Sequence, residues 1–414
     1  MSPVVRRVLL GNALSAIGSG LTMPLLIVYL GQVRGLGTAV AGIVVAYVAV
    51  VSLILLPLSG AAVDHFGPRP ILLGGLLVEA TGVALLTQVH SVPTAFIVAT
   101  VIAVGGSFVW GPQSALLGRL TDPEHRQRVF GIQFMLLNLG IGIGGIIAAV
   151  VVRVEQPDTF TVLYLADAAT YLLYVAVLLT MPGVGVGPAP TEDGEPAPRS
   201  GYREVVRDRV LVRVAILGLV LLTCGYGSIE VGLPVFITVI NGLAVSWVAV
   251  AFAVNTFTIV AMQMLSLRMM TGRSRSALMA TVAALWAASW LIIGVSGLLP
   301  MTAAVVLICL STFVFAVGET LWAPIAPALI NDLAPDHLRG RYNSVQGLVW
   351  GISGALGPAL AGLLLGADLV ALWIGVVVAG CVVAGVLAVQ LRGHLTPALD
   401  GRLPVEPPSG TMPA

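Results

Sequence analysis

The sequence contains no lysine and little charge of either sign. Only 9% of its 414 residues are charged, whereas a soluble globular domain carries about 25% charged residues. With 58% hydrophobic residues and a mean hydropathy of +1.02, a soluble fold could not present enough polar surface to water. The low charge therefore excludes an ordinary soluble domain, and the net charge of +1 gives no support to nucleic-acid binding.

Cysteine and metal-ligand motifs are also scarce. Cys224, Cys309 and Cys381 lie in apolar segments without metal-ligand spacing, which favours a packing role. No HExxH motif occurs, and the histidines lie in loops or near the ends of predicted helices. We therefore expect no metal, no cofactor and no enzymatic activity. A membrane-embedded hydrolase or transferase is a remote alternative.

Long apolar runs take up most of the chain. Each covers roughly 20 to 28 residues, enough for a tilted helix to cross a hydrocarbon core about 30 Å thick. Helices satisfy their backbone hydrogen bonds within one segment, as a bilayer requires. We predict an all-α membrane protein with twelve transmembrane helices at residues 8–30, 38–60, 70–89, 93–117, 129–152, 160–181, 211–239, 245–270, 276–296, 302–330, 342–365 and 369–391.

Arginine supplies all twenty basic residues, and its distribution is lopsided. With the N-terminus inside the cell, eighteen arginines fall in cytoplasmic segments and only Arg34 and Arg153 fall outside. This asymmetry is the positive-inside pattern. It predicts a multi-pass protein of the cytoplasmic (inner) membrane with both termini in the cytoplasm.

The two halves of the sequence repeat one another. A shift of 212 residues places Trp110 on Trp322 and Pro112 on Pro324, and a shift of 213 places Arg126 and Arg128 on Arg339 and Arg341. Two parallel repeats predict a cavity at their interface that opens alternately to each side. The predicted domains are an N-terminal six-helix bundle (1–181), a cytoplasmic linker (182–210), a C-terminal six-helix bundle (211–391) and a cytoplasmic tail (392–414).

The loop after the second predicted helix, residues 60–69, reads GAAVDHFGPR. It resembles the GxxxD(R/K)xG(R/K)(R/K) motif of the major facilitator superfamily, although His65 and Pro68 stand where the motif has basic residues. The matching positions are Gly60, Asp64, Gly67 and Arg69. The resemblance extends over the twelve-helix layout and implies the major facilitator fold.

Physical chemistry suggests how this motif works. Gly60 permits close helix approach, Gly67 permits a tight turn, and Asp64 can bind the positive N-terminus of a helix from the other half. Such a latch would break when the halves rock, although Asp64 could instead simply cap or solvate its loop. The repeated arginines are candidate gating residues or positive-inside anchors, and they are Arg126, Arg128, Arg339 and Arg341.

Four acids lie well inside predicted helices, and no arginine lies comparably deep. A carboxylate in a bilayer faces water, shares a partner or holds a proton. In the superfamily, helices one, four, seven and ten line the cavity, so the resemblance favours Glu230 and Glu319 as proton-coupling residues, both expected to be buried. Glu79 and Asp167 are expected to be neutral or hydrogen-bonded packing residues.

Helical spacing adds candidate cavity residues to these acids. Trp322 follows Glu319 by three residues, and Tyr226 precedes Glu230 by four. Polar stripes and an aromatic residue on the first and fourth helices complete the predicted cavity lining, which comprises Asn12, Ser15, Ser19, Thr22, Trp110 and Gln113. For each tryptophan, ordinary packing or interfacial anchoring is the alternative.

These features predict a secondary active transporter that works by alternating access. We expect the proton gradient to drive it, without a cofactor. An aromatic cavity with carboxylates and no deep base suits small amphipathic neutral or cationic compounds, as in proton-coupled multidrug efflux. A proton-coupled importer of a small metabolite is the alternative. The expected partners are protons, a small-molecule substrate and the lipid bilayer, and we expect a monomer.

The topology is testable in intact cells. A cysteine introduced by Gly194→Cys should react with an impermeant maleimide only after permeabilisation, because the linker is predicted to be cytoplasmic. The native cysteines should stay unlabelled, since all three lie in apolar segments. Full labelling of intact cells would reverse the assigned orientation.

Overall fold

The computed structural model describes residues 1–187 and 201–402. Within these residues the regular structure is helical throughout, and twelve helical segments are long and apolar enough to cross a membrane. The predicted all-α membrane fold is therefore confirmed. Parts of the predicted linker and tail, residues 188–200 and 403–414, lie outside the described residues.

Each span consists of one helix or of two helices in sequence. The first span contains α1 (Pro3–Thr22) and α2 (Leu26–Val28), the fourth contains α5 (Val92–Ser107) and α6 (Trp110–Leu120), and the seventh contains α10 (Arg209–Leu221) and α11 (Gly227–Val235). The other spans are α3 (Thr38–Phe66), α4 (Pro68–Leu85), α7 (Pro123–Val151), α8 (Pro157–Leu179), α12 (Ser246–Met270), α13 (Arg275–Ser296), α14 (Met301–Leu333), α15 (Arg339–Gly366) and α16 (Val370–Leu391). A short helix, α9 (Tyr202–Val205), lies within the predicted linker.

Local signals explain where the helices differ from the predicted ranges. The first helix starts before residue 8 because Pro3 suits the first turn and the Ser2 side chain accepts a hydrogen bond from the Val5 amide at 3.3 Å. The fourth span is broken at Phe108, directly after Gly105 and Gly106, which weaken a helix. The seventh span contains wider, π-type turns at Leu222–Tyr226 and Phe236–Ile240.

The chain divides into two compact units, each held together by its own contacts. Unit 1 comprises Met1–Thr121, Ile132–Val205 and Ala334–Gly351, and unit 2 comprises Asp122–Gly131, Val206–Leu333 and Ile352–Ala414. The first turns of α7 therefore belong to unit 2, and the first half of α15 belongs to unit 1. At these two helices the compact units depart from the order of the sequence repeats.

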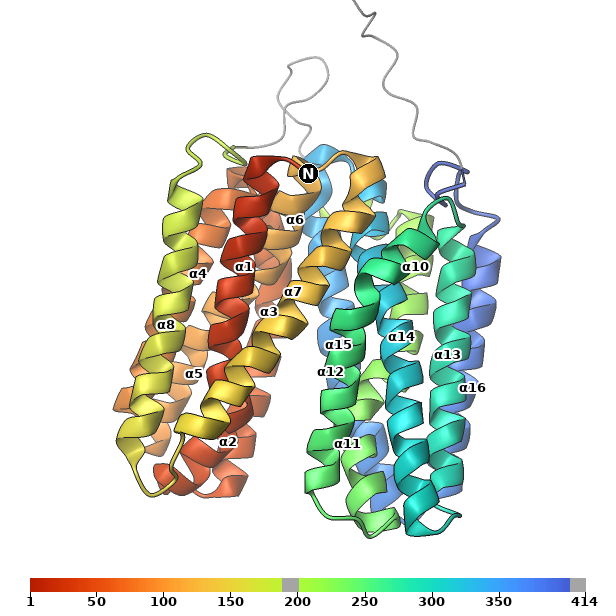
Figure 1. The fold of residues 1–414 in the computed structure, drawn as a ribbon. Helices are drawn as coiled ribbons and strands as arrows, with labels where there is room; N and C mark the ends of the chain where they lie inside the picture. The colour runs from red at the N-terminus through yellow and green to blue at the C-terminus, as the bar shows by residue number, and fades with distance from the viewer. Residues whose placement is uncertain (188–200, 403–414) are drawn as a thin grey trace, which may run out of the picture. The chain divides into compact units, whose positions relative to one another are not determined.

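Within each unit the helices run side by side (Figure 1). In unit 1, α8 packs on α1 and α4, and α5 packs on α3 and α4. In unit 2, α13 packs on α14 and α16, and α12 packs on α14. Large buried aromatic side chains fill the spaces between helices, including Tyr174 in unit 1 and Trp286, Trp290 and Trp373 in unit 2.

Many large apolar side chains point out of the units. Ile54, Val150, Phe257 and Leu363 are 66%, 70%, 76% and 75% exposed. Ile54 and Phe257 lie in the middle of spanning helices, and Val150 and Leu363 lie near the ends of theirs. Water would make such exposure costly, whereas acyl chains make it favourable. The apolar outer faces therefore agree with a multi-pass membrane protein.

Glycine allows α7 to approach α1 closely in unit 1. A β-carbon added to Gly144 would overlap the carbonyl oxygen of Ile17 and approach Gly20 to 2.9 Å. The adjacent Gly145 is different, since its added β-carbon would have Gly20 O as nearest neighbour, at 4.0 Å. Small residues are the usual means of close helix packing in membranes.

This packing role predicts a position-specific effect. Gly144→Ala should destabilise the protein by about 1–3 kcal/mol through overpacking, whereas Gly145→Ala should have little effect. Thermal unfolding of both variants in detergent micelles measures the difference. Equal unfolding midpoints would contradict the close approach of α1 and α7.

Candidate functional site

Asp64 lies near the end of α3 and binds the first turn of α15. Its Oδ1 accepts a hydrogen bond from the Gly340 amide at 2.6 Å, and its Oδ2 accepts one from the Arg341 amide at 3.3 Å. The Arg341 guanidinium adds an ion pair to Oδ2 at 2.7 Å. We call Asp64, Gly340 and Arg341 the Asp64 latch.

The latch combines two favourable interactions with a carboxylate. The first amides of a helix have no partner within the helix, and the N-terminus carries a partial positive charge. The Asp64 side chain is only 5% exposed, so water competes little for its oxygens. The structure thus places Asp64 at a helix N-terminus, in the geometry suggested by the sequence.

Two glycines bring the latch helices together. A β-carbon on Gly60 would lie 2.8 Å from the Gly340 carbonyl oxygen and from the Ser344 side chain. A β-carbon on Gly340 would overlap the Gly60 carbonyl oxygen. The backbones of α3 and α15 can therefore approach closely enough for a short aspartate side chain to reach the amides.

The other motif residues have different partners. Gly67 has a φ of 87°, a conformation that favours glycine, and it separates α3 from α4. Arg69 donates through Nε and Nη2 to the Leu178 carbonyl at 3.1 and 3.0 Å, near the C-terminal end of α8. Arg69 thus ties α4 to the negative end of a helix dipole.

In unit 2 the acid that pairs with arginine is Asp332, which does not belong to a loop motif like that of Asp64. Asp332, near the end of α14, accepts from Arg126 Nη1 and from Arg275 Nη1, both at 2.6 Å. All three side chains are at most 9% exposed. Arg126 also donates to the Asn331 carbonyl at 3.2 Å. The sequence prediction named Arg126 but missed Asp332 and Arg275.

The segment after α16 folds back onto this cluster. Asp400 is fully buried, accepts from the Ser276 amide at 2.9 Å and from the Ser274 hydroxyl at 2.8 Å, and pairs with Arg402 at 2.8 Å. Arg275 Nη1 also donates to the Leu399 carbonyl at 3.1 Å. The N-terminus of α13 is therefore held by the described part of the C-terminal segment.

The repeated arginines differ in exposure and in the acids with which they pair. Arg341 forms the latch of unit 1, whereas Arg128, its counterpart in the repeat, is exposed. Conversely, Arg126 binds the buried Asp332, whereas its counterpart Arg339 pairs with Asp336, which is 63% exposed. Because the Asp336 carboxylate is solvated, this pair should contribute less to stability than the buried Asp332 pairs.

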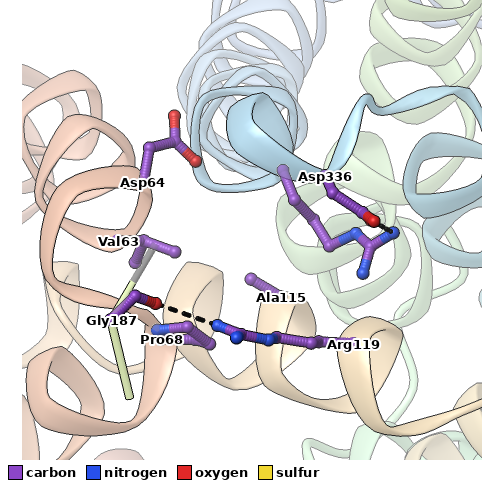
Figure 2. Close-up of a pocket in the computed structure, with 8 residues that line it drawn as sticks. Val63, Asp64, Pro68, Ala115, Arg119, Gly187 and Asp336 are labelled. Atoms are coloured by element: carbon purple, nitrogen blue, oxygen red, sulfur yellow. Dashed lines mark hydrogen bonds and ion pairs between the residues drawn. The ribbon is translucent and has the colours of Figure 1, made fainter. Parts of the chain in front are cut away.

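A small polar hollow lies beside the latch in unit 1. Figure 2 shows Arg119 reaching across it to the Gly187 carbonyl, a hydrogen bond of 3.0 Å. The hollow carries two arginines and two aspartates, so its charges balance. It is lined by Val63, Asp64, Pro68, Ala115, Arg119, Gly187, Asp336 and Arg339.

Glu319 is buried in α14. It is 4% exposed, and the Asn255 side-chain amide of α12 donates to its Oε2. Among residues 1–187 and 201–402, no arginine or histidine forms an ion pair with it. Sequence reasoning selected Glu319 but missed Asn255, because an asparagine in an apolar helix carries no sign of its partner.

Glu230 differs from the expectation that both acids are buried. It lies in α11 and is exposed, so that expectation is wrong for Glu230. The π-type turn at Leu222–Tyr226 lies just before α11 and changes the direction of the following side chains. The ring of Tyr226 lies among aromatic side chains, with its centroid 6.5 Å from that of Trp286 and 6.4 Å from that of Phe315.

The predicted polar cavity residues of the first and fourth spans face the interior of unit 1. Asn12 donates to Gln113 Oε1 at 3.4 Å, and Tyr174 donates to the same oxygen at 3.0 Å. Thr22 donates to Asp167 Oδ2 at 2.6 Å. The other members of the stripe behave similarly: Ser15 is buried and bonded to a backbone carbonyl, and Ser19 bonds Tyr171. Cavity lining stays a prediction for these residues.

The two equivalent tryptophans have different surroundings. Trp110, at the start of α6, is 54% exposed, whereas Trp322, one turn beyond Glu319, is 4% exposed.

Asp167 is buried at 1% exposure, in agreement with the predicted hydrogen-bonded packing role. Glu79 packs on α5, since a β-carbon on Gly105 would approach its backbone and carboxyl group.

Twelve apolar helices, duplicated arginine motifs and a buried carboxyl group that has no basic ion-pair partner among the described residues are the features of a multi-pass membrane transporter. The sequence profile of the Major Facilitator Superfamily matches residues 8–358. The chain therefore belongs to this family.

Relatives and solved structures agree with this membership. The chain is 24% identical over 366 residues to "Multidrug resistance protein MdtH" of Aeromonas salmonicida (strain A449), covering 86% of each chain. It is 26% identical over 355 residues to the protein of that name from Yersinia pestis (strain Pestoides F), covering 84% of this chain and 83% of the relative.

Similar solved structures support the fold. A bacterial homologue of the iron transporter ferroportin, in an outward-facing state, has a TM-score of 0.79 at 14% identity, covering 95% of this chain and 100% of that one. The human organic anion transporter MFSD10 has a TM-score of 0.69 at 17% identity, covering 94% and 99%. At these identities the likeness concerns the fold alone.

The Asp332 cluster leads to a stability prediction. Asp332→Asn should destabilise the protein by about 3–5 kcal/mol, because it leaves two buried arginines without their counter-charge. Asp336→Asn is the control, since it removes an exposed carboxylate only four residues away. Thermal unfolding in detergent measures both variants, and equal midpoints would show that the buried cluster contributes no more than a surface pair.

Proposed function

We propose that this transporter exports small amphipathic neutral or cationic compounds in exchange for protons. The observation that carries the proposal is Glu319, a buried carboxyl group in α14 that accepts a hydrogen bond from the neutral amide of Asn255. A carboxylate held in an apolar interior without a cation is costly. Binding a proton or a cationic cargo removes that cost, so one group can serve both ligands in turn.

Competition for Glu319 gives exchange. When the site opens to the more acidic outside, protonation favours cargo release. When it opens to the cytoplasm, loss of the proton restores the carboxylate and favours cargo capture. The Asn255 amide donates to Oε2 and so stabilises the carboxylate that must accept the proton. Glu230, in α11 and four residues after Tyr226, is proposed to tune the site.

The chemistry near Glu319 suits apolar and cationic cargo. Tyr226 precedes Glu230 by four residues, and Trp322 follows Glu319 by one helical turn. Aromatic faces attract cations and bind apolar groups, whereas a carboxylate repels phosphates and carboxylates. The relatives from Aeromonas salmonicida and Yersinia pestis are named multidrug resistance proteins, which supports the same class of cargo.

The Asp64 latch is proposed as a gate. Its contacts join residues about 276 positions apart in the sequence, and they depend on alignment of one carboxylate with one helix N-terminus. The Asp332 cluster would act in the same way in unit 2. We further propose a monomer in the cytoplasmic membrane with both termini inside, as the arginine distribution predicts, and with no catalytic activity.

Substitution of Glu319 tests the coupling. Glu319→Gln mimics the protonated acid and cannot lose a proton, so cargo-induced proton movement should fall to background while some binding of neutral cargo persists. Everted vesicles challenged with a chemically diverse panel allow cargo accumulation and collapse of the proton gradient to be recorded together.

The matched control is Glu79→Gln, which removes a membrane-embedded acid of unit 1 and should leave coupling largely intact. Both variants should be compared at equal expression. Wild-type proton movement in Glu319→Gln would exclude Glu319 as the proton carrier, and accumulation without proton movement in the wild type would exclude antiport.

A further inference from the structure

Tyr202 of α9 touches the Asp64 latch from the side of the linker. Its hydroxyl lies 2.6 Å from the Pro57 carbonyl oxygen of α3 and 2.8 Å from the Ser344 hydroxyl of α15. The carbonyl can only accept, so Tyr202 donates to Pro57 and can accept from Ser344. Ser344 has a single hydroxyl proton, and the Arg341 carbonyl, 2.8 Å away and one turn earlier in α15, competes with Tyr202 for it.

The ring of Tyr202 lies against the arginine of the latch. The Arg341 guanidinium carbon is 5.6 Å from the ring centroid, within the range of a cation–π interaction. The same guanidinium pairs with Asp64 at 2.7 Å. A long arginine side chain has many rotamers, and an aromatic face on one side with a carboxylate on the other restricts it to the paired geometry.

Tyr202 must keep its hydroxyl proton in order to donate a hydrogen bond to the Pro57 carbonyl. Burial raises the pKa of the Tyr202 hydroxyl above its ordinary value of 10.0, and the nearby Ser344 and Arg341 oppose this increase. The hydroxyl therefore keeps its proton in neutral solution and remains a donor to Pro57. A neutral tyrosine also adds no charge that would compete with Asp64.

The other described end of the linker also contacts the motif. The Gly187 amide donates to the Phe66 carbonyl at 3.0 Å, and the Gly185 carbonyl accepts from the Arg69 amide at 3.1 Å. A β-carbon on Gly67 would lie 2.6 Å from the Gly185 carbonyl oxygen. The residues that flank positions 188–200 thus bind α3, α4 and α15 around the latch.

We propose that Tyr202 is a positioning residue for the Asp64 latch, so that α9, within the described part of the linker, forms part of the gate. The proposal rests on the gating role proposed for Asp64. Tyr202 holds Arg341 through its ring and orients α15 through its hydroxyl. Displacement of α9 would release both and weaken the latch.

The test measures the latch itself, independently of cargo and protons. Spin labels at Phe66 and Pro335, exposed positions beside the ends of α3 and α15, report the distance across the latch in purified protein without substrate. Tyr202→Phe removes the hydroxyl and keeps the ring, and it should reduce the short-distance population. Tyr202→Leu removes both and should reduce it further. Tyr202→Trp restores an aromatic face and should recover part of the loss.

A matched control and a double substitution separate positioning from general stability. Tyr47→Phe removes another hydroxyl of unit 1, which bonds Thr100 at 2.9 Å, and should leave the distances unchanged. In an Asp64→Asn background, Tyr202→Leu should have no further effect, because its target is already lost.

Wild-type distances in Tyr202→Leu, or additive effects in the double variant, would overturn the positioning role. Unchanged distances in Asp64→Asn alone would instead overturn the proposed latch. The vesicle assay tests proton coupling through Glu319, so its outcome does not decide the role of Tyr202. Variants are compared only as monodisperse protein, and Tyr202→Trp decides the matter if Tyr202→Leu does not fold.

Discussion

The apolar solvent around the spanning helices determines most of this structure. Water is not available to hydrogen-bond polar groups in a hydrocarbon interior, so each buried polar side chain must find a protein partner. Gln113 Oε1 accepts from Asn12 and Tyr174, and Thr22 donates to one oxygen of Asp167, whereas Asn12 Oδ1 and Gln113 Nε2 are buried without a hydrogen-bond partner among the described residues. The same demand makes Glu319 unusual, since the group that donates a hydrogen bond to it is the neutral amide of Asn255 rather than a cation.

The duplicated sequence meets this demand differently in its two halves. In unit 1 the motif acid Asp64 is present and Arg341 pairs with it. The equivalent loop near residues 268–273 lacks an acid, and Asp332 at the end of α14 takes its place as the partner of Arg126. A fixed arginine repeat is therefore compatible with different acids, provided that each buried guanidinium finds a counter-charge.

The fold was predictable because long apolar runs and the arginine distribution each carry a strong physical signal. The Asp64 contact was predictable because the motif specifies both a turn and an acid. Three other contacts could not be predicted, because nothing in the local sequence indicates a partner that is far away along the chain. They are the contacts of Asp332 with Arg126, of Asn255 with Glu319 and of Tyr202 with Ser344, at separations of 206, 64 and 142 residues. The exposure of Glu230 was missed because an apolar span does not reveal which face is turned inward, and π-type turns change the register.

A gate must also be weak enough to open, which limits how the latch can be built. Reversing a two-state population from 1:99 to 99:1 takes about 5.5 kcal/mol of differential stabilisation, so a much stronger contact would hold one state permanently. Hydrogen bonds to a charged group contribute about 1.5–3 kcal/mol each, but desolvation of Asp64 offsets part of that gain. Arg341 remains 16% exposed, which lowers the cost of separating the pair. A neutral tyrosine beside this arginine fixes its direction without adding another charge pair, so the latch gains geometric specificity while remaining reversible.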